Sequence, residues 1–307
     1  MPPNFEVDHE SKILIFVSAT SSLQLTNLLL DAFNFELCLR KLALSEQRIV
    51  RDTRHNSVKA LVLRLFSKYV LNYSLFVSGE HASFKPWDEL ELLFNGYGKP
   101  KLGRLDSSKI EFNSSSSNNL ASITVQFNSD SPVGIDLSHE SQDSISSTDF
   151  MLQFQGIFTR AEIDQLESID DVHLKYCTFN HFWTLKEAFA KFLGTGLNID
   201  LTSFGFQLGN HLAFQKDKTT PSSGSRELDW HHDITVDIGD LPEDIRKDIQ
   251  TKPIKCSSTI LQPSSGQLLP VIMSVVHQTN VEHYQCIQID MEKIVKGIID
   301  GNESYQV

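Results

Sequence analysis

The chain has 307 residues, 40% of them hydrophobic, which is enough to bury a substantial core and argues against a disordered protein. Its 27 basic and 39 acidic residues give a net charge of −12, which opposes non-specific binding to nucleic acid or to an anionic membrane surface. The four cysteines lie far apart without CxxC spacing, so we predict neither a zinc site nor a disulfide framework, and a reducing, cytoplasmic location. No secretion signal and no 18-residue apolar stretch is recognised, so no transmembrane helix is predicted.

The first hundred residues predict a strand, a helix and a loop. A short, partly β-branched apolar run at 12–19 indicates a buried strand. Apolar residues at helical spacing predict one helix from Leu44 to about residue 71, with Ser45 as its N-terminal cap. Glycine and proline in 95–102 indicate a loop.

A group of strands and a polar connection follow. Strands are predicted around 110–113, 120–127 and 133–137. The serine-rich stretch between the first two is interpreted as a polar turn rather than a linker between domains. The polar segment 138–149 is the best boundary between two halves that composition offers.

The second half predicts helices and then strands. A helix over 158–169 begins with Thr159 and Glu162 in capping-box spacing, and a helix over about 172–194 stops at a glycine. The remaining predicted segments are a Pro/Ser/Gly-rich loop at 215–228, strands at 269–277 and 284–289, and a terminal helix over 291–300.

Two stretches carry residues suited to chemistry. Trp183, Glu187 and Lys191 are spaced by four, so they share one ridge of the predicted helix, roughly opposite its apolar stripe. By itself this pattern also fits an ordinary solvated Glu–Lys pair. Asp136 ends a strongly apolar strand, where it is either a turn or capping aspartate or a ligand of a hard metal ion. Asp136 and Glu187, with substrate phosphate and water, would suit Mg²⁺, which takes few protein ligands.

The combination of motifs resembles the 4′-phosphopantetheinyl transferase superfamily. The family's (V/I)G(V/I)D strand matches VGID at 133–136, and its (F/W)xxKE(A/S)xxK helix matches WTLKEAFAK at 183–191. FTRAE at 158–162, YGKP at 97–100 and the basic segment 48–64 are similar to further family segments in the same order. Each motif alone is weak, but five in the right order make a specific resemblance that covers roughly residues 40–240.

The resemblance implies a surfactin-type α+β fold of two similar lobes, residues 1–132 and 133–307, with the active site in the cleft between them. Within the family, GTGLNIDL at 194–201 and the single strand carboxylate in GIDLSHE are most similar to fungal members of lysine biosynthesis, which activate α-aminoadipate reductase. Bacterial members carry D-x-E on this strand, where this chain has Asp136-Leu137-Ser138. A water or another group would have to replace the missing metal ligand.

The implied activity is transfer of 4′-phosphopantetheine from coenzyme A to a carrier-domain serine, with release of 3′,5′-ADP. The resemblance assigns Mg²⁺, with Mn²⁺ as an alternative, to Asp136 and Glu187. Glu187 is the expected base for the serine hydroxyl. Lys191 is expected to hold a phosphate oxygen as a point charge. The implied partners are coenzyme A and apo carrier domains, that of α-aminoadipate reductase first, and the implied state is a monomer.

The expected contacts to coenzyme A come from three segments of the first lobe. Lys99 and one of the three arginines Arg48, Arg51 and Arg54 are candidates for its 3′-phosphate, although these residues also fit an ordinary basic helix and loop. Asn113, Ser115 and Ser116 fall in the family's F-N-x-S-H segment. Ser116 stands where the histidine would be, which removes a possible positive charge but keeps a hydrogen-bond donor.

A second hypothesis from a different class remains open. The missing histidine and the missing second strand carboxylate would also fit a catalytically weak or inactive module that binds a carrier domain. Asp136, Glu187 and Lys191 argue for an enzyme, because a binding scaffold has no need for all three.

Overall fold

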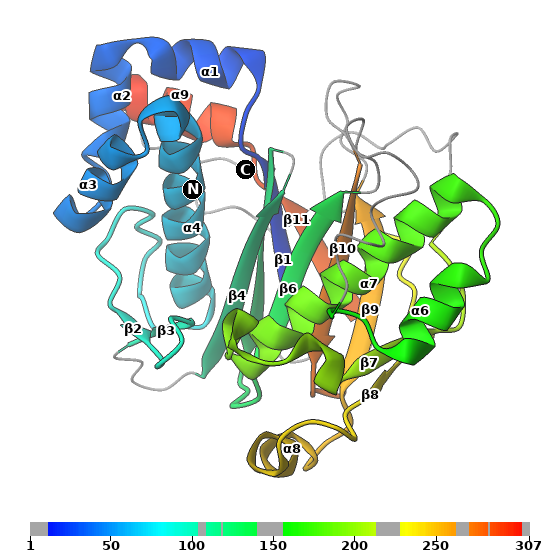
Figure 1. The fold of residues 1–307 in the computed structure, drawn as a ribbon. Coiled ribbons are helices and arrows are strands. Elements are labelled where there is room, and N and C mark those ends of the chain that lie inside the picture. Colours follow the sequence, from blue (N-terminus) through cyan, green and yellow to red (C-terminus); the bar gives the residue numbers. More distant parts are fainter. Residues whose placement is uncertain are drawn as a thin grey trace.

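A computed structural model describes residues 12–103, 109–117, 119–139, 156–212, 228–261, 270–281 and 283–302. These residues form an α+β fold, as predicted, in which helices flank two neighbouring β-sheets (Figure 1). The predicted boundary at 138–149 and the predicted loop at 215–228 lie almost entirely outside the described residues.

The described elements follow each other from a first strand to a last helix. The helices are α1 Leu23–Leu30, α2 Ala32–Leu39, α3 Leu44–Asp52, α4 Ser57–Val77, α6 Arg160–Glu167, α7 Val172–Leu193, α8 Glu243–Ile249 and α9 Met291–Ile299. The strands are β1 Lys12–Ala19, β2 Leu92–Phe94, β3 Pro100–Leu102, β4 Ile110–Ser117, β5 Leu120–Phe127, β6 Val133–His139, β7 Gly205–Leu208, β8 Ile234–Asp237, β9 Lys255–Leu261, β10 Val271–His277 and β11 His283–Gln288.

The first sheet has the order β11-β1-β5-β4, and β1 pairs with β11 in parallel and with β5 antiparallel. Leu14 and Phe16 of β1 enter one hydrophobic core with residues of α1, α2, α4 and α9. The last strand and helix of the chain, β11 and α9, therefore belong to the core of the first hundred residues (Figure 1). The division into lobes at 132/133 stays a prediction. The packing shows in addition that the chain returns to its first part with β11 and α9.

The second sheet has the order β6-β10-β9, and α7 packs on β6 and β10. Ile13 and Ile15 on the other face of β1 belong to a separate hydrophobic cluster with Val133, Ile135 and residues of β10. Both faces of β1 are therefore covered, by helices on one side and by the second sheet on the other. This double burial explains why β1 is a continuous apolar run in the sequence and not an alternating one.

The helix predicted from Leu44 to residue 71 is wrong as a single element, because the chain breaks it into α3 and α4. Thr53 donates its hydroxyl to the Val50 carbonyl at 2.6 Å, and Arg54 follows with a left-handed φ of 44°. Ser45 does not cap α3, whose N-cap is Ala43. Contrary to expectation, the helical segment Arg54–Val77 is long and apolar enough to cross a membrane, because an 18-residue window within it has a mean hydropathy of 1.3. In the structure, however, 67% of that window is buried inside the protein.

The serine run also differs from the prediction of a turn. Ser114–Ser117 continue strand β4, opposite Ile123, Ser122, Ala121 and Leu120 of β5. The reversal falls after Ser117, where Asn119 has a left-handed φ of 64°. Asparagine tolerates that backbone conformation better than most residues, so Asn119, and not the serines of β4, lies at the turn.

His181 predicts an acid-sensitive fold. It is fully buried on α7, neither ring nitrogen has a hydrogen-bond partner among the described residues, and burial lowers its pKa to about 3. The unfolded chain binds a proton at His181 near pH 6.5, whereas the folded protein binds it only near pH 3. Above pH 6.5 this histidine therefore costs no stability, and as the pH falls from 6.5 toward 3 protonation of the unfolded state lowers the free energy of unfolding. Between pH 7 and pH 5 we expect the free energy of unfolding to drop by about 2 kcal/mol from this residue.

The measurement is urea unfolding at both pH values for the parent protein and for His181→Leu. The variant should show a pH dependence smaller by about that amount, because leucine has no proton to bind. The exposed His173 on the same helix provides the control, and His173→Gln should leave the pH dependence unchanged. An equal pH dependence in His181→Leu and the parent would contradict the assignment.

Candidate active site

The candidate site forms where β6 lies directly against α7. Gly134 of β6 allows this approach, because a Cβ atom there would fall onto the Ala188 carbonyl oxygen and lie 2.6 Å from the Phe192 nitrogen. Asp136 is two residues further along the same strand, and Glu187 and Lys191 lie on the facing helix. The glycine of the VGID motif thus permits the strand and helix to bring the candidate residues together.

Gly134→Ala should therefore damage both stability and the site. Overpacking of this kind destabilises by about 1–3 kcal/mol or more, and here the obstructing atoms are helix backbone, which has little room to move. Thermal unfolding and a transfer assay would measure the two effects. Gly96→Ala is the matched control, since nothing lies within 4 Å of a Cβ at Gly96 and its Tm should stay within about 1 °C. Parent-like stability of Gly134→Ala would contradict the close strand–helix contact.

Asp136 is buried and held from both sides. Its Oδ1 accepts hydrogen bonds from the Ser115 hydroxyl at 2.8 Å and from Lys191 Nζ at 2.7 Å. Burial raises the pKa of Asp136, while Lys191 and Ser115 act in the opposite direction. Lys191 therefore forms an ion pair with Asp136. The alternative of a solvated Glu187–Lys191 pair, considered for the isolated helix, did not predict this contact.

Glu187 is half-buried beside this group. Burial raises its pKa, and the nearby Asp136 carboxylate raises it further, with Lys191 opposing both. Two carboxylates and one ammonium thus share a partly desolvated site, and the surplus negative charge is what a bound divalent cation would relieve. Among the described residues no set of three or more His, Cys, Asp and Glu side chains forms a complete metal site. The residues present therefore suit a hard cation that takes its other ligands from substrate and water.

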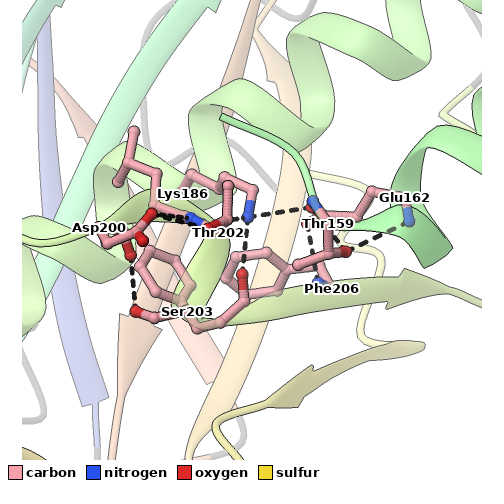
Figure 2. Close-up of polar contacts among 9 residues, drawn as sticks. Thr159, Glu162, Lys186, Asp200, Thr202, Ser203 and Phe206 are labelled. Atoms are coloured by element: carbon pink, nitrogen blue, oxygen red, sulfur yellow. Dashed lines mark hydrogen bonds and ion pairs between the residues drawn. The ribbon is translucent and has the colours of Figure 1, made fainter. Parts of the chain in front are cut away.

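A fully buried ion pair between Lys186 and Glu162 connects α7 to α6 (Figure 2). Lys186 Nζ lies 2.9 Å from Glu162 Oε2 and donates to the carbonyls of Leu201 and Phe204 at 2.7 Å each. All three of its protons therefore have acceptors. Glu162 in turn completes the predicted capping box with Thr159. The pair connects α6, α7 and the segment after α7, which gives Lys186 a structural role.

A cavity of about 470 Å³ opens next to Asp136 and Lys191. Ser114, Ser115 and Ser116 line it from β4, and helix α4 adds Leu63, Phe66 and Ser67. This volume lies within the usual range of small-molecule sites. Sequence reasoning missed the α4 residues, and the only signal was a serine, Ser67, within an otherwise apolar helix face.

The predicted coenzyme A residues do not all meet here. Arg51 makes two hydrogen bonds of 2.8 Å to Glu36, and that carboxylate raises the Arg51 pKa. Arg48 lies 3.9 Å from Asp52, and both side chains are exposed. Arg54 is exposed at the break between α3 and α4. None of the three lines the cavity, so their assignment to the 3′-phosphate stays a prediction.

The other predicted coenzyme A residues lie in different surroundings. Lys99 is buried, burial lowers its pKa to about 8, and its Nζ donates to the carbonyls of Val133 and Phe192 at 3.1 and 3.3 Å. Asn113 is buried and accepts the amide of Ile135 at 3.0 Å. Ser116 is exposed and lines the cavity. Binding of coenzyme A by these residues stays a prediction, and the structure gives Lys99 and Asn113 partners within the protein.

Comparison with known proteins finds sequence similarity in the segment that forms this site. Residues 132–241, which contain β6, α6 and α7, match the sequence model of the 4′-phosphopantetheinyl transferase superfamily. The segment that holds the candidate site is thus similar to this superfamily. The match contains both motif segments, VGID and WTLKEAFAK, on which the resemblance was first based.

Among curated proteins the chain is similar to transferases named L-aminoadipate-semialdehyde dehydrogenase-phosphopantetheinyl transferase. That of Eremothecium gossypii is 30% identical over 171 residues, which cover 56% of this chain and 58% of the relative. That of Candida glabrata is 27% identical over 173 residues, with coverage of 56% and 62%. The human protein is 28% identical over 198 residues, with coverage of 57% and 63%. The chain thus spans about three fifths of the length of the relatives that it matches.

Proposed function

We propose that this protein is a 4′-phosphopantetheinyl transferase that converts apo carrier domains to their holo form. The observation that carries the proposal is the group of Asp136, Glu187 and Lys191 beside a serine-lined cavity, within a segment that is similar to this superfamily. The names of the relatives support a carrier domain of L-aminoadipate-semialdehyde dehydrogenase, the α-aminoadipate reductase, as the first substrate to test.

In the proposed reaction the carrier serine oxygen attacks the phosphorus that bears pantetheine. The bond from that phosphorus to the bridging pyrophosphate oxygen breaks, and 3′,5′-ADP leaves. Glu187 accepts the serine proton, a role for which its half-buried position and raised pKa are suited. Lys191 places its ammonium where Asp136 meets the cavity, so it can hold a phosphate oxygen.

The residues present would hold Mg²⁺ or Mn²⁺ through Asp136 and Glu187. When bound, the cation would neutralise pyrophosphate charge and polarise the phosphorus. The protein's own residues orient this pair: Ser115 and Lys191 fix Asp136, and the Lys186–Glu162 pair fixes the turn of helix that carries Glu187. We also propose that the protein is a monomer and that it acts in the cytoplasm.

Mass spectrometry of a carrier domain tests the function directly. The protein is incubated with coenzyme A, Mg²⁺ and an apo carrier domain of an aminoadipate reductase, and the carrier should gain the mass of phosphopantetheine. Reactions without Mg²⁺, or with a carrier whose serine is replaced by alanine, should give no gain. No gain with several apo carriers, together with measurable binding to them, would favour the carrier-binding module.

A further inference from the structure

The open edge of strand β6 is held by side chains and not by another strand. Within the described part of the chain, β6 is the outer strand of its sheet and pairs only with β10, while β4 next to it is the outer strand of the first sheet. In an antiparallel pair, alternate residues turn their backbone groups toward the partner. The odd-numbered residues Val133, Ile135 and Leu137 of β6 therefore direct their backbone groups away from β10.

Four side chains meet this edge. Lys99 Nζ donates to the Val133 carbonyl, the Asn113 side-chain oxygen accepts from the Ile135 amide, and Ser115 Oγ accepts from the Leu137 amide. The fourth, Lys191 Nζ, donates to the Ile135 carbonyl at 3.2 Å. We call Lys99, Asn113 and Ser115 the β6 clasp, because Lys191 already belongs to the candidate site.

The spacing of the clasp follows from strand geometry. Asn113 and Ser115 are two residues apart on β4, so they point to the same face, and their partners Ile135 and Leu137 are two residues apart on β6. Asp136 lies between these two anchored amides. Ser115 contacts it directly, since the hydroxyl that accepts the Leu137 amide also donates to Asp136 Oδ1 at 2.8 Å.

We infer that Lys99, Asn113 and Ser115 are positioning residues, which fix the register and distance of β6 and so place Asp136, rather than residues that supply affinity for coenzyme A. This inference rests on the proposed function for its kinetic consequence. Buried backbone groups without hydrogen-bond partners are unfavourable, so all three residues oppose a shift of β6. Asn113 and Ser115 of β4 join the two sheets, and Lys99 joins the segment before β3 to β6. The N-x-S spacing of this segment is then a structural requirement of the strand edge.

The first test needs neither substrate nor activity. Amide hydrogen exchange measured by NMR should be at least about tenfold faster at Ile135 in Asn113→Leu and at Leu137 in Ser115→Ala, because each substitution removes the hydrogen-bond acceptor. Ser115→Thr keeps a hydroxyl and should exchange at close to the parent rate. The amide of Ile15 in the core of β1 reports global opening, and its exchange should accelerate less than that of Ile135 or Leu137. Unchanged exchange at Ile135 and Leu137 in both variants would overturn the clasp.

The second test separates positioning from coenzyme A binding. Asn113→Leu and Ser115→Ala should lower kcat by roughly 10- to 100-fold, because Asp136 is misplaced, while the calorimetric Kd for coenzyme A stays within about threefold. Ser115→Thr should recover most of kcat. A tenfold or larger rise in Kd with unchanged kcat would overturn the inference and make these residues coenzyme A ligands.

A stability control completes the design. Asn72 is a buried asparagine on α4 that donates to three backbone carbonyls and touches neither β6 nor the cavity lining. Asn72→Ala should lower Tm without changing kcat or the exchange of the Ile135 and Leu137 amides. If the parent protein transfers nothing to any carrier, the proposed function fails, whereas the exchange experiment still decides whether the clasp exists.

Discussion

Glu187→Gln should lower the transfer rate at saturating coenzyme A and carrier by about 10²–10⁴-fold, the usual contribution of a general base. Glutamine keeps the size of the side chain and its place on α7 but cannot accept the serine proton or add charge to a metal site. The measurement is the rate of phosphopantetheine gain by the carrier, followed by mass spectrometry.

Stability separates this effect from damage to the fold. Burial and Asp136 raise the pKa of Glu187, which means that the folded protein holds this carboxylate at some disadvantage. The Tm of Glu187→Gln at pH 7 should therefore equal or exceed that of the parent. Glu167→Gln changes an exposed glutamate on α6 and should leave both rate and Tm unaltered. More than about a tenth of the parental rate in Glu187→Gln would exclude Glu187 as the base.

Of the substitutions proposed for this protein, Lys186→Met should lower the free energy of unfolding most. Lys186 and Glu162 both have side chains with 0% exposure, and removing the ammonium leaves a buried carboxylate without its cation. Breaking a buried pair in this way costs about 3–5 kcal/mol, which corresponds to a fall in Tm of roughly 10 °C for a chain of this size. Thermal and urea unfolding measure the loss, and Lys175→Met on the same helix should stay within about 0.5 kcal/mol.

A double variant tests the physical reason. Glu162→Gln in the Lys186→Met background removes the orphaned charge while keeping an oxygen that can accept the Phe206 amide, to which Glu162 Oε1 is bonded at 2.9 Å. The double variant should therefore be more stable than Lys186→Met alone. A double variant no more stable than the single one would show that lost packing, and not the unpaired charge, causes the damage.

Local signals predicted much of the fold. The capping box of Thr159 and Glu162 and the glycine after α7 were predicted from sequence and are present, because helix ends are set by groups within a few residues. Strands β1, β5 and β6 were likewise visible as apolar runs. The break between α3 and α4 was not predicted, because the polar stretch 51–57 holds no proline or glycine that would mark the end of a helix, while the backbone at Arg54 turns left-handed.

For the candidate site, the motifs predicted which residues to consider: Asp136 in VGID, and Glu187 and Lys191 on one ridge of a helix. Their spacing on single elements is fixed by strand and helix geometry, so it can be derived without a fold. The contacts that these residues make became visible in the folded arrangement. Lys191 pairs with Asp136, Lys186 with Glu162, and Lys99, Asn113 and Ser115 with the edge of β6. These partners lie 22 to 55 residues apart in the sequence. A contact across that separation depends on how sheets and helices pack, which no local pattern encodes.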